Sequence, residues 1–106
     1  QLAWYKAMEE EGQMVMIRDK KGPWITHLAL WKDGEPADKK PIGYVLSIEG
    51  ADSFITVNHM ERAYAYGLRA VGPAHYGPGR YANGTDSTGH LNAWGKSCCV
   101  PWIAWV

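Results

Sequence analysis

Two residues with side chains suited to catalysis or metal binding follow the ends of short apolar segments. Glu49 closes the apolar run Ile42–Ile48, and His75 follows a second run, Leu68–Val71, just beyond Gly72-Pro73. A charge at the end of a buried strand is costly unless something compensates it. In α/β folds, ligands and metals bind at the carboxyl ends of the strands. Glu49 is therefore a candidate ligand-binding residue, the alternative being a strand that has simply reached solvent.

The pattern between the two runs predicts how these side chains are positioned. Both runs have the length and composition of buried strands, and a helix is expected near Val57–Tyr66 with Thr56 as its N-cap and Gly67 as its C-cap. Strand, helix and strand at this spacing form a βαβ unit with parallel strands. Glu49 and His75 should then project from the same edge of the sheet. The helical stripe that would pack on this sheet comprises Met60, Ala63, Tyr64 and Leu68.

The first forty residues indicate further α/β elements. A helix is expected over Leu2–Glu11, a short strand or extended connector over Met14–Ile17, and a polar loop over Glu35–Lys40. Pro23 suits the first position of a second helix. His27 lies beside the apolar face of that helix, where a packing or surface role is expected. The residues at helical spacing on this face are Trp24, Leu28 and Trp31.

A long polar segment, Tyr76–Gly95, follows the candidate site. Loops of this length are uncommon in compact domains unless they line a site or are disordered. Four of its side chains could contact a polar ligand, the alternative being a solvated loop: Arg80, Tyr81, Asn83 and Asp86.

Composition restricts the classes of partner. The 106 residues suit one small domain, and the formal net charge of zero gives no indication of nucleic acid or of an acidic membrane surface. No apolar stretch approaches the roughly 20 residues that span a bilayer, so we expect no membrane partner and a cytoplasmic or trimmed protein. The adjacent Cys98 and Cys99 predict neither a disulfide between them nor a zinc site.

Several segments together resemble the membrane dipeptidase (renal dipeptidase) family of zinc metallopeptidases, in its bacterial branch. The similarity extends to about Gly95 and is carried by QLAWYKAMEEEG, IRD, HLALW, PIGYVLSIEGAD and ERAYAYGLRAVGPAHYGPGRYANGTD. Family members are (β/α)8 barrels that hydrolyse dipeptides with two metal ions at the C-terminal mouth. The resemblance implies that residues 1–95 are a central slice of such a barrel, with two or three β/α units.

The resemblance also implies residue roles. Glu49 matches the carboxylate that bridges the two zinc ions, and is thus both a metal ligand and a catalytic residue. His75 matches the histidine that contacts the dipeptide substrate. Two bridged cations would lower the pKa of a shared water, and a histidine can donate a hydrogen bond to the carbonyl oxygen as it gains charge.

The chain departs from the family pattern in its metal ligands. The family's His-x-Asp motif is absent, and two further ligand histidines of the family belong to later barrel strands that have no counterpart here. Of the family's metal ligands, only Glu49 is present. We therefore expect little or no dipeptidase activity from this chain alone.

The tail, residues 96–106, also departs from the family, in which a charged amphipathic helix follows. One allowed codon choice for SCCVPWIAWV, prefixed by G and read one base earlier, encodes ELLRAMDRLG, a family-like helix. The tail could therefore be out of frame after a base lost at Lys96. We expect such a tail, with Trp102 and Trp105, to lie against another copy or against an exposed sheet.

Two alternatives to the enzyme fragment remain open. One is a small non-catalytic binding or structural module that holds a polar ligand, such as a sugar, with its Trp and Tyr residues and the 76–95 loop. The other is an assembly in which several copies, or another chain, complete a barrel. Because a slice of a barrel leaves open strand edges, we expect a homo-oligomer or association through those edges.

Overall fold

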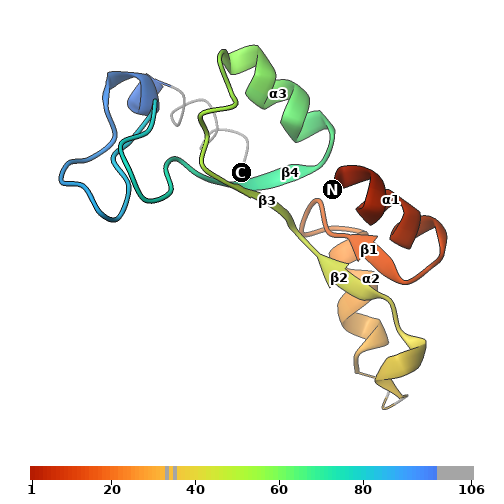
Figure 1. Ribbon diagram of the computed structural model, residues 1–106. Helices are drawn as coiled ribbons and strands as arrows, with labels where there is room; N and C mark the ends of the chain where they lie inside the picture. Colours follow the sequence, from red (N-terminus) through yellow and green to blue (C-terminus); the bar gives the residue numbers. More distant parts are fainter. Residues whose placement is uncertain (33, 35, 98–106) are drawn as a thin grey trace. The chain divides into compact units, whose positions relative to one another are not determined.

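The computed structural model describes residues 1–32, 34 and 36–97, which form a mixed α/β structure of short helices and strands (Figure 1). The chain divides into two compact units, Gln1–Leu46 and Ser47–Val106. Among the described residues, no helix has both the length and the apolar character to span a membrane. The tail expected to pack on another copy lies almost wholly outside the described residues.

The first unit contains a pair of parallel strands and two helices. Strand β1 (Met14–Met16) pairs with β2 (Ile42–Tyr44) in a register that sets Met14 opposite Ile42 and Met16 opposite Tyr44. The predicted first helix is confirmed to within a residue, and the segment expected to be a strand or an extended connector forms a short strand. The elements are α1 (Leu2–Glu10), β1 (Met14–Met16), α2 (Pro23–Leu30), a 3-10 turn (Ala37–Lys39) and β2 (Ile42–Tyr44).

Helix α1 is held to the strands by a stacked ring pair and by one carboxylate. The rings of Tyr5 and Tyr44 stack with their centroids 4.8 Å apart. The Met16 amide donates to Glu9 Oε1 at 2.8 Å, which links the helix to β1. Burial raises the pKa of the Tyr44 hydroxyl, and the nearby Glu9 carboxylate raises it further.

Helix α2 differs from its prediction in the face that it buries. The expected apolar face, Trp24, Leu28 and Trp31, is exposed. The half-buried residue is instead His27, whose ring lies against Gly43 so closely that a Cβ there would be 2.5 Å from its Nε2. Trp31 Nε1 donates to that Nε2 at 3.0 Å. His27 is thus a packing residue, as expected. The helix is apolar nearly all round, and its two tryptophans, Trp24 and Trp31, remain 41% and 45% exposed.

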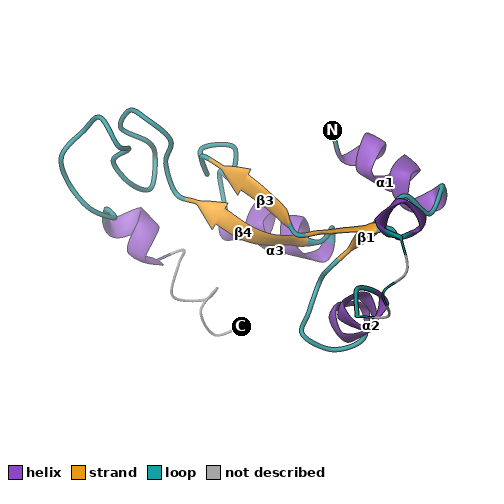
Figure 2. Cartoon of the chain, turned by 90° about the horizontal axis from the view of Figure 1, so that it is seen from below, coloured by secondary structure: helices purple, strands orange, loops and turns teal. Residues whose placement is uncertain are grey.

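The second unit contains the predicted βαβ arrangement. Strands β3 (Leu46–Glu49) and β4 (Leu68–Gly72) are neighbours in one sheet and run in the same direction, with α3 (Val57–Ala65) connecting them (Figure 2). Gly67, with φ +112°, ends the helix as predicted, because a residue without a Cβ adopts that conformation readily. The buried core of the unit comprises Ala51, Phe54, Met60, Leu68, Tyr81 and Ala82.

The single buried strand expected over Ile42–Ile48 is wrong in two respects. The segment forms two strands, β2 and β3, which pair with different partners and are interrupted at Val45. It is not buried on both faces either, since the residues of β3 alternate between half-buried and exposed. A strand in a two-stranded sheet, with a helix on one face, has only that face to bury, and its side chains therefore alternate.

The N-cap of α3 gives a first testable prediction. Thr56 is extended, and its Oγ1 accepts a hydrogen bond from the His59 amide at 3.4 Å. Thr56→Ala removes this acceptor and should lower the free energy of unfolding by about 1 kcal/mol, whereas Thr56→Ser should retain most of it. Urea denaturation of the three proteins measures the difference. Equal losses in both variants would contradict a capping role.

Candidate functional site

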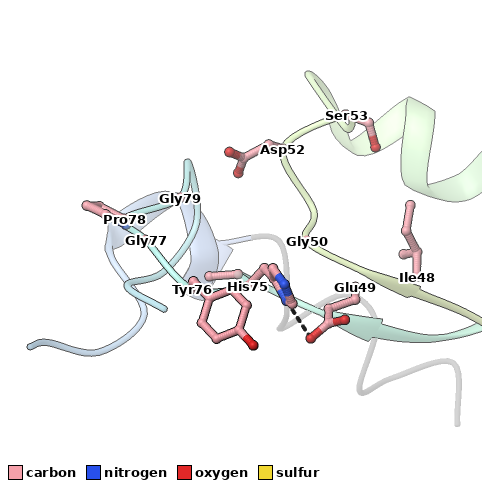
Figure 3. A pocket seen from close by; sticks show the side chains of 11 residues that line it. Ile48, Glu49, Gly50, Asp52, Ser53, His75, Tyr76, Gly77, Pro78 and Gly79 are labelled. Carbon is pink, nitrogen blue, oxygen red and sulfur yellow. Dashed lines mark ion pairs between the residues drawn. The ribbon is translucent and has the colours of Figure 1, made fainter. Parts of the chain in front are cut away.

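Glu49 and His75 meet at one edge of the second sheet. His75 Nδ1 lies 2.6 Å from Glu49 Oε1, and Figure 3 shows the two side chains directed toward each other. The spacing of the strands predicted that these two side chains lie at one edge of the sheet, and this prediction is confirmed. The premise of a buried carboxylate is wrong, because 70% of the Glu49 side chain and 52% of the His75 side chain are exposed. Solvent reaches this ion pair, so the carboxylate needs no further compensation.

The backbone after the two strands explains why these residues meet. Glu49 is the last residue of β3, and His75 lies three residues beyond the end of β4. The amide of Gly50 donates to the carbonyl of Gly72 at 3.0 Å, which continues the pairing past the end of β3. Gly50 has φ +85°, a conformation that glycine adopts without steric cost, and there the chain turns away from the sheet.

An open hollow of about 550 Å³ lies over this edge of the sheet. Its polar side chains include two carboxylates, an imidazole and a phenol, which could bind a polar ligand or hold one ligand position of a metal. It is bordered by the segments that follow β3 and β4: Ile48, Glu49, Gly50, Asp52, Ser53, Ala74, His75, Tyr76, Gly77, Pro78 and Gly79 (Figure 3).

Asp52 and Tyr76 also border this hollow, and neither was among the predicted site residues. Asp52 Oδ1 accepts a hydrogen bond from the Arg80 amide at 2.8 Å. The ring of Tyr76 contacts that of His75 edge-on, with centroids 4.2 Å apart. Asp52 could have been found from the sequence, since it stands three residues after Glu49 in the same IEGAD motif.

The four predicted ligand residues of the loop do not gather at the hollow. Arg80 approaches it through its backbone amide. The Asn83 side chain donates to the Thr88 carbonyl, and the amide of Asp86 donates to the Tyr76 carbonyl. These hydrogen bonds join residues within the loop itself. The loop residues Asn83 and Asp86 are therefore not brought to Glu49.

Tyr81 is a correction to the predicted ligand set. It is 2% exposed, and its hydroxyl donates to the carbonyl of Phe54. A tyrosine in a polar loop is typical of a residue that contacts a ligand. Here, however, the Tyr81 ring is part of the buried core beneath the loop.

A conservative substitution tests this structural role of Tyr81. Tyr81→Phe leaves the buried ring in place and removes the hydroxyl that donates to the Phe54 carbonyl. We expect the free energy of unfolding to fall by roughly 1–3 kcal/mol, because a buried acceptor loses its partner. Thermal or urea unfolding measures the loss. Unchanged stability combined with weaker ligand binding would restore Tyr81 as a contact residue.

The residues present fit one part of a zinc site. Glu49 offers an exposed carboxylate at the strand end, which suits a single ligand position. Within residues 1–32, 34 and 36–97, however, no three His, Cys, Asp or Glu side chains come together as a metal site would require. Zinc centres use at least three protein ligands. A complete centre therefore needs ligands in addition to those of the described part of the chain; Cys98 and Cys99 lie outside it.

Comparisons with protein-family models, with curated proteins and with solved structures found no match to this chain.

Proposed function

We propose that this chain is the central part of a zinc-dependent dipeptidase with a (β/α)8 barrel, and that its hollow is part of the active site. One observation carries the proposal: Glu49 and His75 lie in contact at the carboxyl ends of two neighbouring strands that run in the same direction. Active sites of (β/α)8 barrels occupy that end of the strands. The IEGAD and YGLRAVG motifs, which give the resemblance, are the segments that build this edge.

The two residues would have separate roles in the complete enzyme. Glu49 would hold the metal ions through its carboxylate. The bound ions would supply a water activated near neutral pH. His75 would donate a hydrogen bond to the carbonyl oxygen of the scissile peptide bond as that oxygen gains charge. Because Nδ1 of His75 faces Glu49, Nε2 is the nitrogen that remains for the substrate.

The test is a protein in which the gene is read through residue 96 in the frame that encodes ELLRAMDRLG. The product should carry further β/α units, bind zinc and hydrolyse dipeptides. Glu49→Gln should remove both the zinc and the turnover. Glu61→Gln, the same change at an exposed position of α3, should preserve both. Full activity in the Glu49 variant, or no dipeptidase-like sequence in that frame, would overturn the proposal.

A binding module is a second candidate, favoured by two exposed aromatic residues. Tyr76 borders the hollow and is 62% exposed, and Trp94 in the following segment is 61% exposed. Exposed aromatic rings of this kind offer an apolar face, which can pack against the C–H face of a sugar ring, together with a polar N–H or O–H group. Under this alternative, the unaltered chain would bind a neutral oligosaccharide without metal, with a change in the intrinsic tryptophan fluorescence as the readout. Binding of this kind, abolished by Tyr76→Ala, would replace the dipeptidase proposal.

A further inference from the structure

The segments that follow β3 and β4 are joined by two hydrogen bonds between residues far apart in the sequence. Asp52 Oδ1 accepts from the Arg80 amide at 2.8 Å, across a separation of 28 residues. The Tyr81 hydroxyl donates to the Phe54 carbonyl from the next position along the loop. Tyr81 is buried, whereas Asp52 is exposed and borders the hollow. The hydrogen bond between Asp52 and Arg80 is therefore the connection that lies at the proposed site.

The turn after Pro78 fits closely against Asp52. A Cβ built on Gly79 would lie 3.0 Å from Asp52 Oδ1 and 3.2 Å from the Ala82 carbonyl oxygen. The amide of Gly79 donates to that same carbonyl at 2.8 Å, which closes the turn. A Cβ built on Gly77, two residues earlier in the same segment, would meet nothing within 4 Å. Of these two glycines only Gly79 is closely packed; Gly84, farther along the loop, is also closely packed, against the carbonyls of His75 and Tyr76.

This fit bears on His75 because only four residues separate it from Arg80. The carbonyls of His75 and Gly77 also accept hydrogen bonds from Thr85 and Gly84, at 3.1 and 3.0 Å, which connect the backbone on either side of Arg80. An ion pair as exposed as that of Glu49 and His75 does little to hold two side chains in one geometry. A restraint on the backbone is needed, and the bond to Asp52 supplies one.

We infer that Asp52 is a positioning residue: by bonding the Arg80 amide it holds the segment after β4 so that His75 Nδ1 meets Glu49 Oε1. The catalytic consequence of this placement rests on the proposed function, but the placement itself does not. Asp52 acts as a hydrogen-bond acceptor in this role. An asparagine should therefore replace it, whereas an alanine should not.

The experiment follows the His75 ring in the full 106-residue chain. Histidine labelled with ¹⁵N is incorporated, and the imidazole nitrogens are recorded at one fixed pH, in solution or by magic-angle spinning if the chain associates. His75→Gln assigns the His75 signals among those of the four histidines. Glu49→Gln then gives the spectrum of a His75 ring without its carboxylate partner, and the shift of Nδ1 between parent and Glu49→Gln defines the contact.

We expect Asp52→Ala to move the His75 Nδ1 signal most of the way to its position in Glu49→Gln, and Asp52→Asn to leave it near the parent. Gly79→Ala should move it in the same direction, since the added methyl group would crowd the Asp52 carboxylate and the Ala82 carbonyl. Gly77→Ala, in the same segment, should not. Gly79→Ala keeps the test decisive if Asp52→Ala fails to fold.

Two results would overturn the inference, and they differ in meaning. Parent-like signals in Asp52→Ala and Gly79→Ala, while Glu49→Gln still shifts His75, would remove the positioning role and leave the proposed function intact. A His75 signal that does not respond to Glu49→Gln would remove the contact on which both depend. Loss of dipeptidase activity plays no part in this readout, so failure of the proposed function is detected separately.

Discussion

The purified 106-residue chain, supplied with zinc, should hydrolyse dipeptides no faster than buffer does. The His-x-Asp motif is absent from its sequence, and no three potential metal ligands converge in the described part of the chain. A single carboxylate cannot fix two ions or hold a catalytic water in place. The assay is release of free amino acid from a panel of dipeptides. Metal-dependent turnover that disappears in Glu49→Ala would contradict this expectation.

The complete enzyme should show a large effect of His75. Because His75 is proposed to stabilise the oxyanion, His75→Gln should lower kcat by about 10²–10³-fold while zinc content stays at the parent level. His90→Gln, at an exposed position in the following loop, is the matched control and should leave kcat unchanged. A parent-like kcat in the His75 variant, or an equal loss in the control, would exclude the proposed role.

Local patterns in the sequence predicted the second unit well. Met60, the first residue of the predicted stripe, is the buried residue of α3, and Thr56 is its N-cap as predicted, whereas Leu68, counted in the same stripe, begins β4 instead. These features depend on side chains a few residues apart on one element, which periodicity records directly. The same reasoning brought Glu49 and His75 to one edge, because parallel strands joined by a helix leave their carboxyl ends together.

The features that the sequence did not predict depend on residues far apart. Composition alone cannot distinguish a tyrosine that binds a ligand from one, like Tyr81, whose hydroxyl reaches a carbonyl 27 residues away. The bond from Asp52 to Arg80 is of the same kind. The interruption at Val45 arises because β2 and β3 pair with different strands, and hydrophobic periodicity does not record the choice of partner.

The isolated chain should associate with itself in solution. Each sheet in the described part of the chain has only two strands, and such sheets leave open edges that pair readily with other chains. Apolar side chains are also exposed on helix α2, where Ile25 is 62% exposed. Light scattering should therefore report a mass of at least twice that of the monomer, or large aggregates.

A pair of substitutions on α2 shows whether its apolar surface drives this association. Ile25→Lys should shift the scattering mass toward the monomer, because the added charge would have to be desolvated in a contact with another copy. Thr26→Lys adds the same charge at the next exposed position, replaces a polar residue and should have a smaller effect. Equal effects would point to net charge rather than to Ile25. A monomeric parent chain would refute the association altogether and would favour the small binding module over the barrel fragment, since a slice of a barrel cannot cover its own sheet edges.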